Sequence, residues 1–271
     1  MVSEDGYVLG HSDLELKRLA TQARLVDPIT WRYLVSAGIT EGMRVLDVGS
    51  GAGDVAILLA GLVGPAGEVV GTDRARAAID AAQKRIQAGL LANVTLRHGD
   101  PTAMTFDRPF DAVVGRMVLA FIPDPSAALA KLAAHLRPGG ILFFHETDWE
   151  GARSSPSIPT YDRACRWIIQ AADGAGAQLR LGARLAPVFE RAGLPTPTLR
   201  LESVIASGPA AIDAVHLVTD AVATLLPTIE RLGIASASEI ALPSLTQRIV
   251  AEIGADGTLV GRADVGAWTR L

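Results

Sequence analysis

Short apolar segments alternate with amphipathic ones through residues 40–150. Apolar runs that end in Gly or an acidic residue predict buried strands, because a strand covered on both faces is apolar almost throughout. These runs fall at residues 44–49, 68–73, 93–100, 110–115 and 141–146. Helical spacing predicts helices between them at 55–62, 75–88 and 126–136. This alternation is typical of parallel βαβ units, so it predicts an α/β fold with a doubly wound sheet.

The pattern differs on either side of this region. Residues 12–38 have helical spacing, and Pro28 predicts a break into two helices. After residue 150 we expect helices at 159–175 and 183–192, a sixth strand at 198–207 and a closing strand at 258–270. Between these strands, residues 209–253 are predicted to form helices, broken near Pro227, Gly233 and Pro243. The sheet is therefore predicted to have seven strands.

Composition narrows the class of protein. Hydrophobic residues make up 49% of the 271 residues and charged residues 20%, which favours a large core over disorder. The net charge of −4 argues against a nucleic-acid partner. The single cysteine, Cys165, excludes an intramolecular disulfide, and the histidine spacing predicts no metal site. Neither a signal peptide nor a membrane span is predicted, so we expect a soluble, cytoplasmic protein.

The first predicted strand runs into a glycine-rich turn, VLDVGSGAGD, at residues 45–54. A plain strand-to-helix connection is one interpretation. A dinucleotide site is another, but its fingerprint would place a third glycine at position 54, where the chain has Asp54. A carboxylate there would repel a pyrophosphate at the helix N-terminus. Asp47 in the same turn favours a ligand with a positively charged end.

Two further acidic residues end the next two strands. Asp73 closes the second strand and Asp100 the third. In an open α/β sheet, ligands bind outside the carboxyl ends of the strands. A carboxylate on the second strand can accept the hydroxyls of a ribose, and one on the third can accept the amine of an adenine. The alternative for each residue is an ordinary cap or turn. Together they favour a nucleoside ligand.

These motifs resemble those of the class I S-adenosylmethionine-dependent methyltransferases. VLDVGSGAGD is similar to the family's first motif, VVGTD to the second and RHGD to the third. FDAVVGRMVLAFIPDP and LRPGGILFFHE are similar to the region of its fourth and fifth strands. YVLGHSDLELKRLATQARLVDP resembles the N-terminal helix of a bacterial branch near the quinone-biosynthesis enzymes, which act on small molecules.

The resemblance implies S-adenosylmethionine as the cofactor and assigns residues to its methionine end. Asp47, Gly49 and Gly51 would flank the methionine part. Gly115 and Arg116 would line the same end, although a salt bridge at the surface is the alternative for Arg116.

The resemblance also assigns residues to the adenosine end. Asp73 would bind the ribose hydroxyls, with Arg74 near the adenine. Asp100 would contact the adenine amine, with Pro101 beside the ring.

The resemblance further implies one domain over 1–271. Its parts are an N-terminal helical cap (1–39) carrying Tyr7 and Gln22 as further cofactor contacts, a cofactor-binding core (40–150), a completing segment (151–207), a helical lid (208–257) and a closing strand (258–271). The lid is predicted because the last two strands are usually joined by a short turn. A satellite core or a homodimer face is the alternative for it. An apolar lid indicates a small, largely apolar substrate.

Catalysis is less clearly marked. Glu146 follows the apolar run ILFF, so burial would raise its pKa toward that of a general base. His145 is the second candidate, but neighbouring residues of a strand point to opposite faces. The alternative for both is a hydrogen-bonded residue at a strand end. Two other functions stay open: a non-methylating reaction such as a cyclisation, with cofactor retained, and a cofactor-binding interaction module.

Overall fold

A computed structural model describes the backbone of residues 13–271 and the side chains from residue 24 onward. The chain forms two compact units. The sheet unit comprises Asp27–Glu146, Leu181–Arg200 and Val265–Leu271. The helical unit comprises the described residues up to Val26, Thr147–Arg180 and Leu201–Asp264. The prediction of a single domain with its subdivision stays a prediction.

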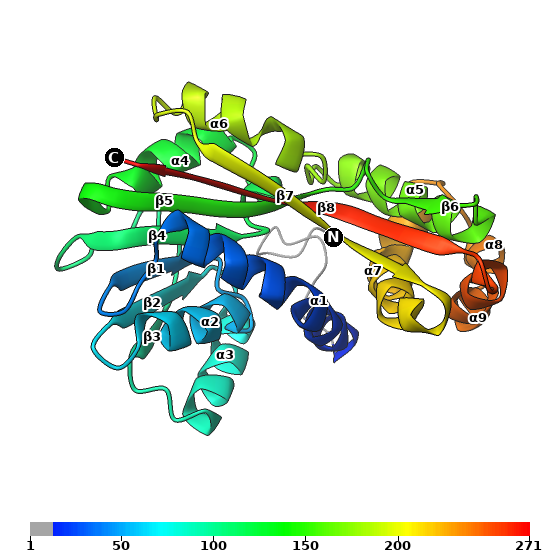
Figure 1. Cartoon of the computed structure of the whole chain (residues 1–271), viewed down its shortest axis with the longest axis horizontal. Coiled ribbons are helices and arrows are strands. Elements are labelled where there is room, and N and C mark those ends of the chain that lie inside the picture. Colours follow the sequence, from blue (N-terminus) through cyan, green and yellow to red (C-terminus); the bar gives the residue numbers. More distant parts are fainter. Residues whose placement is uncertain (1–12) are drawn as a thin grey trace. The chain divides into compact units, whose positions relative to one another are not determined.

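A parallel sheet forms the centre of the sheet unit (Figure 1). Its strands follow the order β3-β2-β1-β4-β5-β8, and the pairs among the first five are parallel. Every residue of β1 is buried, as expected for a strand covered on both faces. The predicted doubly wound sheet is therefore confirmed. The strands are β1 (Arg44–Val48), β2 (Glu68–Asp73), β3 (Val94–His98), β4 (Phe110–Arg116), β5 (Leu136–Asp148) and β8 (Thr258–Arg270).

Helices connect these strands close to where the apolar spacing predicts them. Pro125 begins α4, and the side chain of Asp124 caps it by accepting a hydrogen bond from the amide of Ala127. The elements are α1 (Asp13–Ala37), α2 (Asp54–Val63), α3 (Arg76–Ala88), α4 (Pro125–Ala133) and α6 (Leu185–Arg191), with short 3₁₀ turns at Leu119–Phe121 and Gly182–Arg184.

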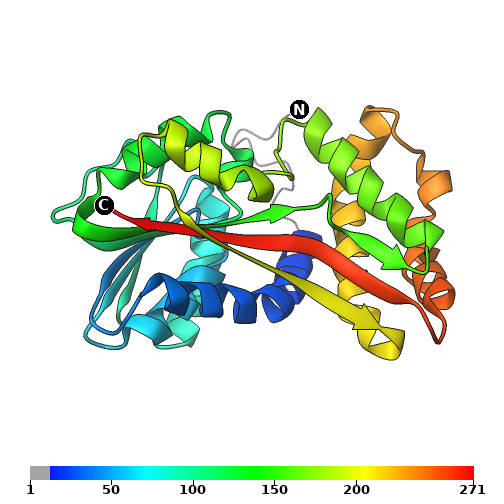
Figure 2. The same ribbon diagram turned by 45° about the horizontal axis from the view of Figure 1, so that its top comes forward.

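The helical unit has a core of its own. In Figures 1 and 2, α5 lies beside α7, and Ile168, Val222 and Ile249 are buried together in one apolar cluster. Strands β6 and β7 pair with β8, the former antiparallel. The elements are β6 (Arg153–Ser155), α5 (Pro159–Gly174), β7 (Thr198–Ser207), a 3₁₀ turn (Gly208–Ala211), α7 (Ile212–Arg231), α8 (Ala237–Ile240) and α9 (Leu242–Ile253).

Three sequence expectations differ from the structure. Pro28 does not break the first helix, because Ile29, Tyr33 and Ala37 continue the buried face beyond it. That burial outweighs the cost of one proline, about 3 kcal/mol. Pro227 likewise lies inside α7. Strand β6 was not predicted, since its three residues, RSS, carry no apolar pattern. In the described part of the chain the sheet therefore has eight strands, not the expected seven.

One helical stretch in the described part of the chain, Gly208–Arg231, is long and apolar enough to cross a membrane by length and composition. Half of its most apolar window is buried inside the structure, as in the core helix of a folded unit. The expected absence of a membrane span stays a prediction.

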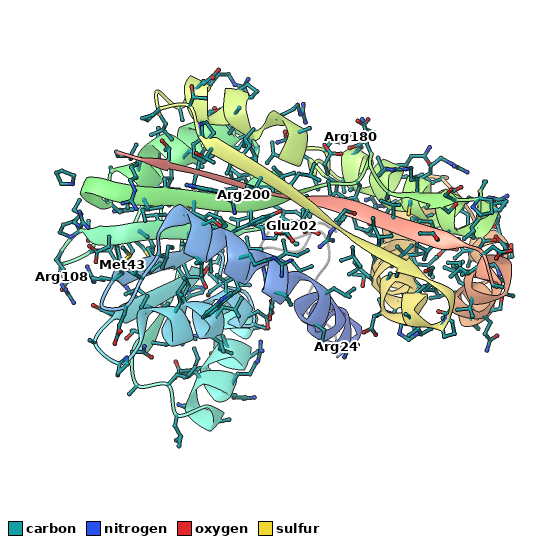
Figure 3. The ribbon with its side chains drawn as sticks, in the orientation of Figure 1. Arg24, Met43, Arg108, Arg180, Arg200 and Glu202 are labelled. Atoms are coloured by element: carbon teal, nitrogen blue, oxygen red, sulfur yellow. The ribbon has the colours of Figure 1, made fainter. Side chains whose placement is uncertain are left out.

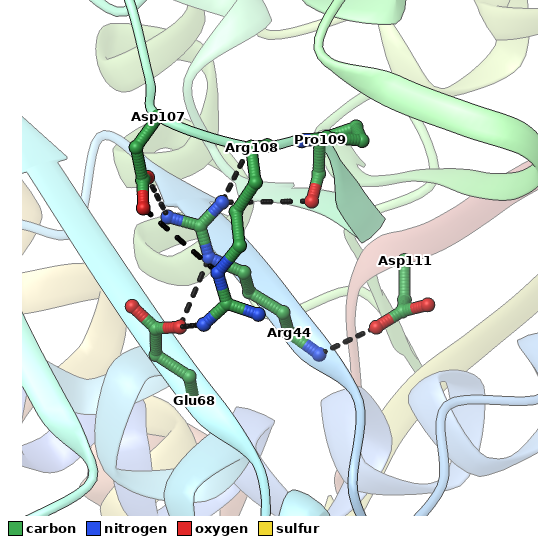
Figure 4. A network of polar contacts seen from close by, with 6 residues as sticks. All are labelled: Arg44, Glu68, Asp107, Arg108, Pro109 and Asp111. Atoms are coloured by element: carbon green, nitrogen blue, oxygen red, sulfur yellow. Dashed lines mark hydrogen bonds and ion pairs between the residues drawn. The ribbon is translucent and has the colours of Figure 1, made fainter.

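A buried arginine ties three strands together at their amino ends (Figure 4). The Arg44 side chain, 8% exposed, donates from Nε to Glu68 Oε2 at 3.0 Å and pairs through Nη2 with Asp107 Oδ1 at 2.7 Å. Its Nη1 donates to the carbonyl oxygen of Arg108. The backbone amide of Arg44 donates to Asp111 Oδ2 at 2.7 Å. This network fixes the edge of the sheet opposite the predicted ligand site.

Replacing this arginine is expected to destabilise the sheet unit. Arg44→Met leaves Glu68 without its buried donor and should lower the free energy of unfolding by about 2–4 kcal/mol in urea titrations. The matched control is Arg108→Met, because the Arg108 side chain is 60% exposed and also pairs with Glu68. It should cost less than about 1 kcal/mol. Equal losses in the two variants would contradict this account.

Candidate functional site

The glycine turn after β1 has a backbone that favours glycine. Gly49, Gly51 and Gly53 have φ angles of +66°, +52° and +88°, in the left-handed region. A Cβ at Gly49 would lie 2.5 Å from Val118 Cγ2, so this position also needs its missing side chain. A Cβ at Gly51 would meet no described atom within 4 Å. The turn therefore presents bare backbone beside open space, at the start of α2.

Asp47 is a buried acid in β1, one residue before the strand ends at Val48 and the glycine turn begins. Its side chain is 1% exposed, and neither carboxylate oxygen accepts a hydrogen bond of ordinary geometry within the described structure. Burial raises the pKa of Asp47 to about 8, and the charges of Asp73 and Asp54 add to the rise, while Arg116 and, more weakly, the Ala56 amide oppose it. A buried carboxylate without donors is costly. The site therefore suits a ligand that brings a positive charge or a hydrogen-bond donor.

Asp73 joins the glycine turn to the end of β2. Its Oδ2 accepts a hydrogen bond from the Gly51 amide at 2.9 Å, and its Oδ1 accepts one from the Ala75 amide at 2.8 Å. The Ser50 amide donates to the Thr72 carbonyl at 2.8 Å, which strengthens the same junction. Each carboxylate oxygen keeps a further lone pair. Asp73 can therefore hold the turn and accept ligand hydroxyls at the same time.

The residues predicted to surround the adenine contact one another. Arg74 pairs with Asp100 Oδ2, and Asp100 Oδ1 accepts from the Thr102 amide at 2.9 Å. Burial raises the pKa of Asp100, but hydrogen bonds from Arg74 and Thr102 bring it below its usual value. The Pro101 carbonyl is hydrogen-bonded to His135 Nε2 at 2.8 Å. The family resemblance implied separate roles for Arg74 and Asp100 and did not indicate this ion pair.

Arg116 at the end of β4 is a buried junction. Its side chain is 6% exposed, and Nη1 lies 2.6 Å from Asp27 Oδ1 and donates to Thr30 Oγ1 at 3.1 Å. Its Nη2 lies 4.0 Å from Asp54 Oδ2, and Asp54 also pairs with Arg85 at 2.7 Å. The ion pair left open for Arg116 is present, but it is buried. The sequence analysis did not identify Asp27 and Thr30 as partners of Arg116. The only signal in the sequence was the position of Asp27 directly before Pro28.

His145 and Glu146 contact opposite sides of β5, as strand alternation predicts. His145 is fully buried, shares a hydrogen bond of 3.1 Å with Thr30 Oγ1 and packs edge-on against Tyr33. Gly115 on the neighbouring strand lies against the Phe144 ring, where any Cβ would clash. The roles predicted for His145 and Gly115 in catalysis and cofactor binding stay predictions.

Glu146 is fully buried on the other side of the strand. Its Oε1 accepts hydrogen bonds from the amides of Val118 and Leu119, at 2.9 and 2.8 Å, while its Oε2 accepts none within the described structure. Burial raises the pKa of Glu146 to about 7, and the amides of Leu119, Val118 and Ala120 limit the rise. Its carboxyl group therefore caps the 3₁₀ turn after β4 and can exchange a proton near neutral pH.

Two predicted cofactor contacts and the metal expectation remain untested. Tyr7 lies outside the described residues, and Gln22 lies in the part of α1 whose side chains are not described. In the described part of the chain, no three His, Cys, Asp or Glu side chains gather as a metal ion would need. That no metal takes part stays a prediction.

The fold and the site together define a class of protein. The strand order, the left-handed glycine turn and the acids at the ends of β1 and β2 are those of a doubly wound α/β protein, with the acids at the sheet edge where ligands of such folds bind. A family model described as a methyltransferase domain matches residues 39–192. The chain belongs to this family, the class I S-adenosylmethionine-dependent methyltransferases. The predicted family and its cofactor, S-adenosylmethionine, are confirmed.

Individual proteins similar to this chain include both curated relatives and solved structures. Demethylmenaquinone methyltransferase of Staphylococcus aureus is 34% identical over 131 residues, 48% of this chain and 51% of the relative. The chain thus spans about half the length of the curated relatives it matches. An S-adenosylmethionine-dependent methyltransferase from Aquifex aeolicus has a TM-score of 0.52 at 21% identity, covering 73% of this chain and 93% of that one. The cyclase SpnF has a TM-score of 0.53 at 21% identity, covering 92% and 80%. The two structures show a shared fold.

The raised pKa of Asp47 predicts a pH-dependent stability. Above pH 3.8, the ordinary pKa of an aspartate, the unfolded chain releases the proton of Asp47, whereas the folded chain keeps it up to about pH 8. The contribution of Asp47 to the free energy of unfolding therefore falls as the pH rises from about 4 to about 8. Asp47→Asn removes the titration. Between pH 5 and 8.5, its free energy of unfolding relative to the unchanged chain should rise by about 2–4 kcal/mol in urea titrations without ligand. The raised pKa of Glu146 affects the stability of the variant and of the unchanged chain in the same way, so its effect cancels in the difference between them. A difference that stays constant with pH would contradict the assignment.

Proposed function

We propose that this chain transfers a methyl group from S-adenosylmethionine to a small, largely apolar metabolite. The observation that carries the proposal is Asp47, a buried carboxyl group beside the left-handed turn at Gly49 and Gly51, whose oxygens accept no hydrogen bond of ordinary geometry within the described structure. Such a site is stabilised by a ligand with a positively charged end. The match of the methyltransferase-domain model to residues 39–192 supports the same activity.

Different residues of the sheet unit would bind different parts of S-adenosylmethionine. Asp47 and the bare backbone of the turn would hold the methionine end, and Asp73 would accept the ribose hydroxyls. Arg74, paired with Asp100, would form the wall beside the adenine. When bound, S-adenosylmethionine supplies a methyl group already activated on a positively charged sulfur, so the protein contributes position and electrostatics.

The acceptor is proposed to be small and apolar on two grounds. The relative with 34% identity is named for demethylmenaquinone. The net charge of −4 disfavours a nucleic-acid substrate. The segment 208–257 contributes apolar residues of α7 and α9, including Val215, Val222 and Ile249. These residues belong to the core of the helical unit, so the lid stays a prediction alongside the satellite core. A homodimer and a cytoplasmic location also stay predictions.

Glu146 is proposed as the general base. A base near neutral pH needs a carboxyl group with a raised pKa, and burial supplies this. With Oε1 fixed by the amides of Val118 and Leu119, Oε2 is the atom that would accept a proton. His145 is the weaker candidate, because its Nδ1 already shares a hydrogen bond with Thr30.

A non-methylating reaction on the same scaffold is the second candidate function. One observation favours it: Glu146 is fully buried, and the amides after β4 occupy one of its oxygens, as expected of a structural cap. The likeness to the cyclase SpnF shows only that the two proteins share a fold. The mass of the reaction product separates the candidates.

Cofactor binding provides the first test. Asp73→Ala should weaken binding of S-adenosylhomocysteine by about 1–3 kcal/mol in isothermal titration, because a charged hydrogen-bond partner is lost. The control is Asp80→Ala, since Asp80 is 63% exposed on the neighbouring helix α3. Circular dichroism should show both variants folded. An unchanged affinity in Asp73→Ala would overturn the assignment, and no binding by the unchanged chain would overturn the function.

Turnover provides the second test. With S-adenosylmethionine and demethylmenaquinone as the first acceptor tried, mass spectrometry should show S-adenosylhomocysteine and an acceptor heavier by one methyl group. Glu146→Gln should lower kcat by about 10²-fold or more and abolish the rise of kcat through about pH 7, because the base is active when deprotonated. Full activity in Glu146→Gln would show that Glu146 is not the general base and only caps the turn after β4. An acceptor consumed without gaining a methyl group would favour the second candidate function.

A further inference from the structure

The helical unit contains a groove that the proposed methyl transfer does not use. Its volume of about 430 Å³ lies within the range of small-molecule sites, about 300–1,000 Å³. One wall is the segment that follows β5, from Trp149 to Arg153, the first residue of β6. The other is one face of α5, since Asp162, Arg166 and Ile169 recur at helical spacing. Arg180, labelled in Figure 3, completes the lining. All of these residues belong to the helical unit.

The lining includes three apolar side chains, Trp149, Cys165 and Ile169, which we call the floor of the groove. Trp149 is 4% exposed, and the guanidinium of Arg262 lies 5.3 Å from its ring centroid. Cys165 is buried, and burial raises the pKa of its thiol to about 12, so it is a neutral part of the floor. Ile169 is partly buried beside them. A flat apolar ring can pack against this floor.

The acidic residues of the lining already have partners. Asp162 accepts hydrogen bonds from the hydroxyls of Ser154 and Ser157, at 2.8 and 3.1 Å. Glu150 lies 3.5 Å from Arg180 Nε, and the same guanidinium pairs with Asp173 at 2.8 Å. Arg180 is therefore largely neutralised by its own neighbours.

Two arginines of the lining, Arg153 and Arg166, have no carboxylate partner within residues 24–271. Arg153 donates to the carbonyl oxygen of Gly151 at 3.2 Å, an uncharged partner. Arg153 and Arg166 are both exposed, and within residues 24–271 neither lies within ion-pair distance of a carboxylate. The rim of the groove thus offers two guanidinium groups above an apolar floor. A guanidinium matches a carboxylate through two parallel hydrogen bonds.

We propose that this groove binds a small aromatic or alicyclic carboxylate. Arg153 and Arg166 hold the carboxylate, and the ring lies on Trp149 and Ile169. Glu150 and Asp162 lie in the same lining and repel further negative charge, which restricts the ligand to one anionic group and disfavours nucleotides. The site needs neither S-adenosylmethionine nor the residues of the sheet unit.

Isothermal titration of the full chain with three probes tests the ligand class. The probes are 2-naphthoate, its uncharged amide 2-naphthamide, and acetate. Naphthoate should bind at least about tenfold more tightly than naphthamide, because only the charged probe engages the arginines. It should also bind more tightly than acetate, which lacks a ring for the floor. No binding of naphthoate at millimolar concentration, or equal binding of acid and amide, would overturn the proposal.

Substitutions test the location. Arg166→Gln and Arg153→Gln should each weaken naphthoate binding by about fivefold and leave naphthamide binding unchanged, because both side chains are exposed and a single charge is lost. Arg163→Gln is the matched control: it removes an exposed arginine from the same helix at a position outside the lining. The melting temperature should be unchanged in all three. Equal weakening by Arg163→Gln would show a general charge effect and overturn the site.

Discussion

A buried carboxyl group at the end of β1, Asp47, is the constraint on which the site depends. Asp47 lies where no side chain or amide of the described structure donates to it with ordinary geometry. Taking a carboxylate out of water costs several kcal/mol unless a partner compensates. The fold responds by raising the pKa of Asp47 and by placing Arg116 close enough to act on it through its charge. The partner that the Asp47 carboxylate still lacks is one that a cationic ligand can supply.

The glycine turn converts this constraint into a binding site. Left-handed φ angles at Gly49 and Gly51 turn the chain sharply, and the Gly51 amide is fixed by Asp73. Stability and ligand binding therefore share one carboxylate at the end of β2. The open space beside Gly51 follows from the same geometry, since nothing described would contact a side chain there. A turn that served only to connect β1 to α2 would need neither the buried acid nor this opening.

Local patterns in the sequence were enough to predict the sheet and the acids along its edge. A strand followed by Asp73 fixes where that carboxylate lies, because the carboxyl ends of parallel strands share one edge. The contacts of Arg116 were not predictable in this way. Its partner Asp27 lies 89 residues away in the sequence and just before Pro28, which indicated a helix break. The Arg74–Asp100 pair was missed for a similar reason, since it joins side chains of different loops. Such pairs depend on how elements pack, and no single segment records that.

Glu146 shows why burial alone does not separate a structural acid from a catalytic one. Two amides on Oε1 favour the charged form, whereas the apolar surroundings favour the neutral form, and the balance leaves a pKa of about 7. A structural cap needs only the first effect, and a general base needs both. Because the amides of Val118 and Leu119 bind a single oxygen, a proton can arrive at Oε2 without breaking the cap. The geometry is therefore compatible with both roles at once, and the chemistry at Oε2, not the burial of the side chain, distinguishes them.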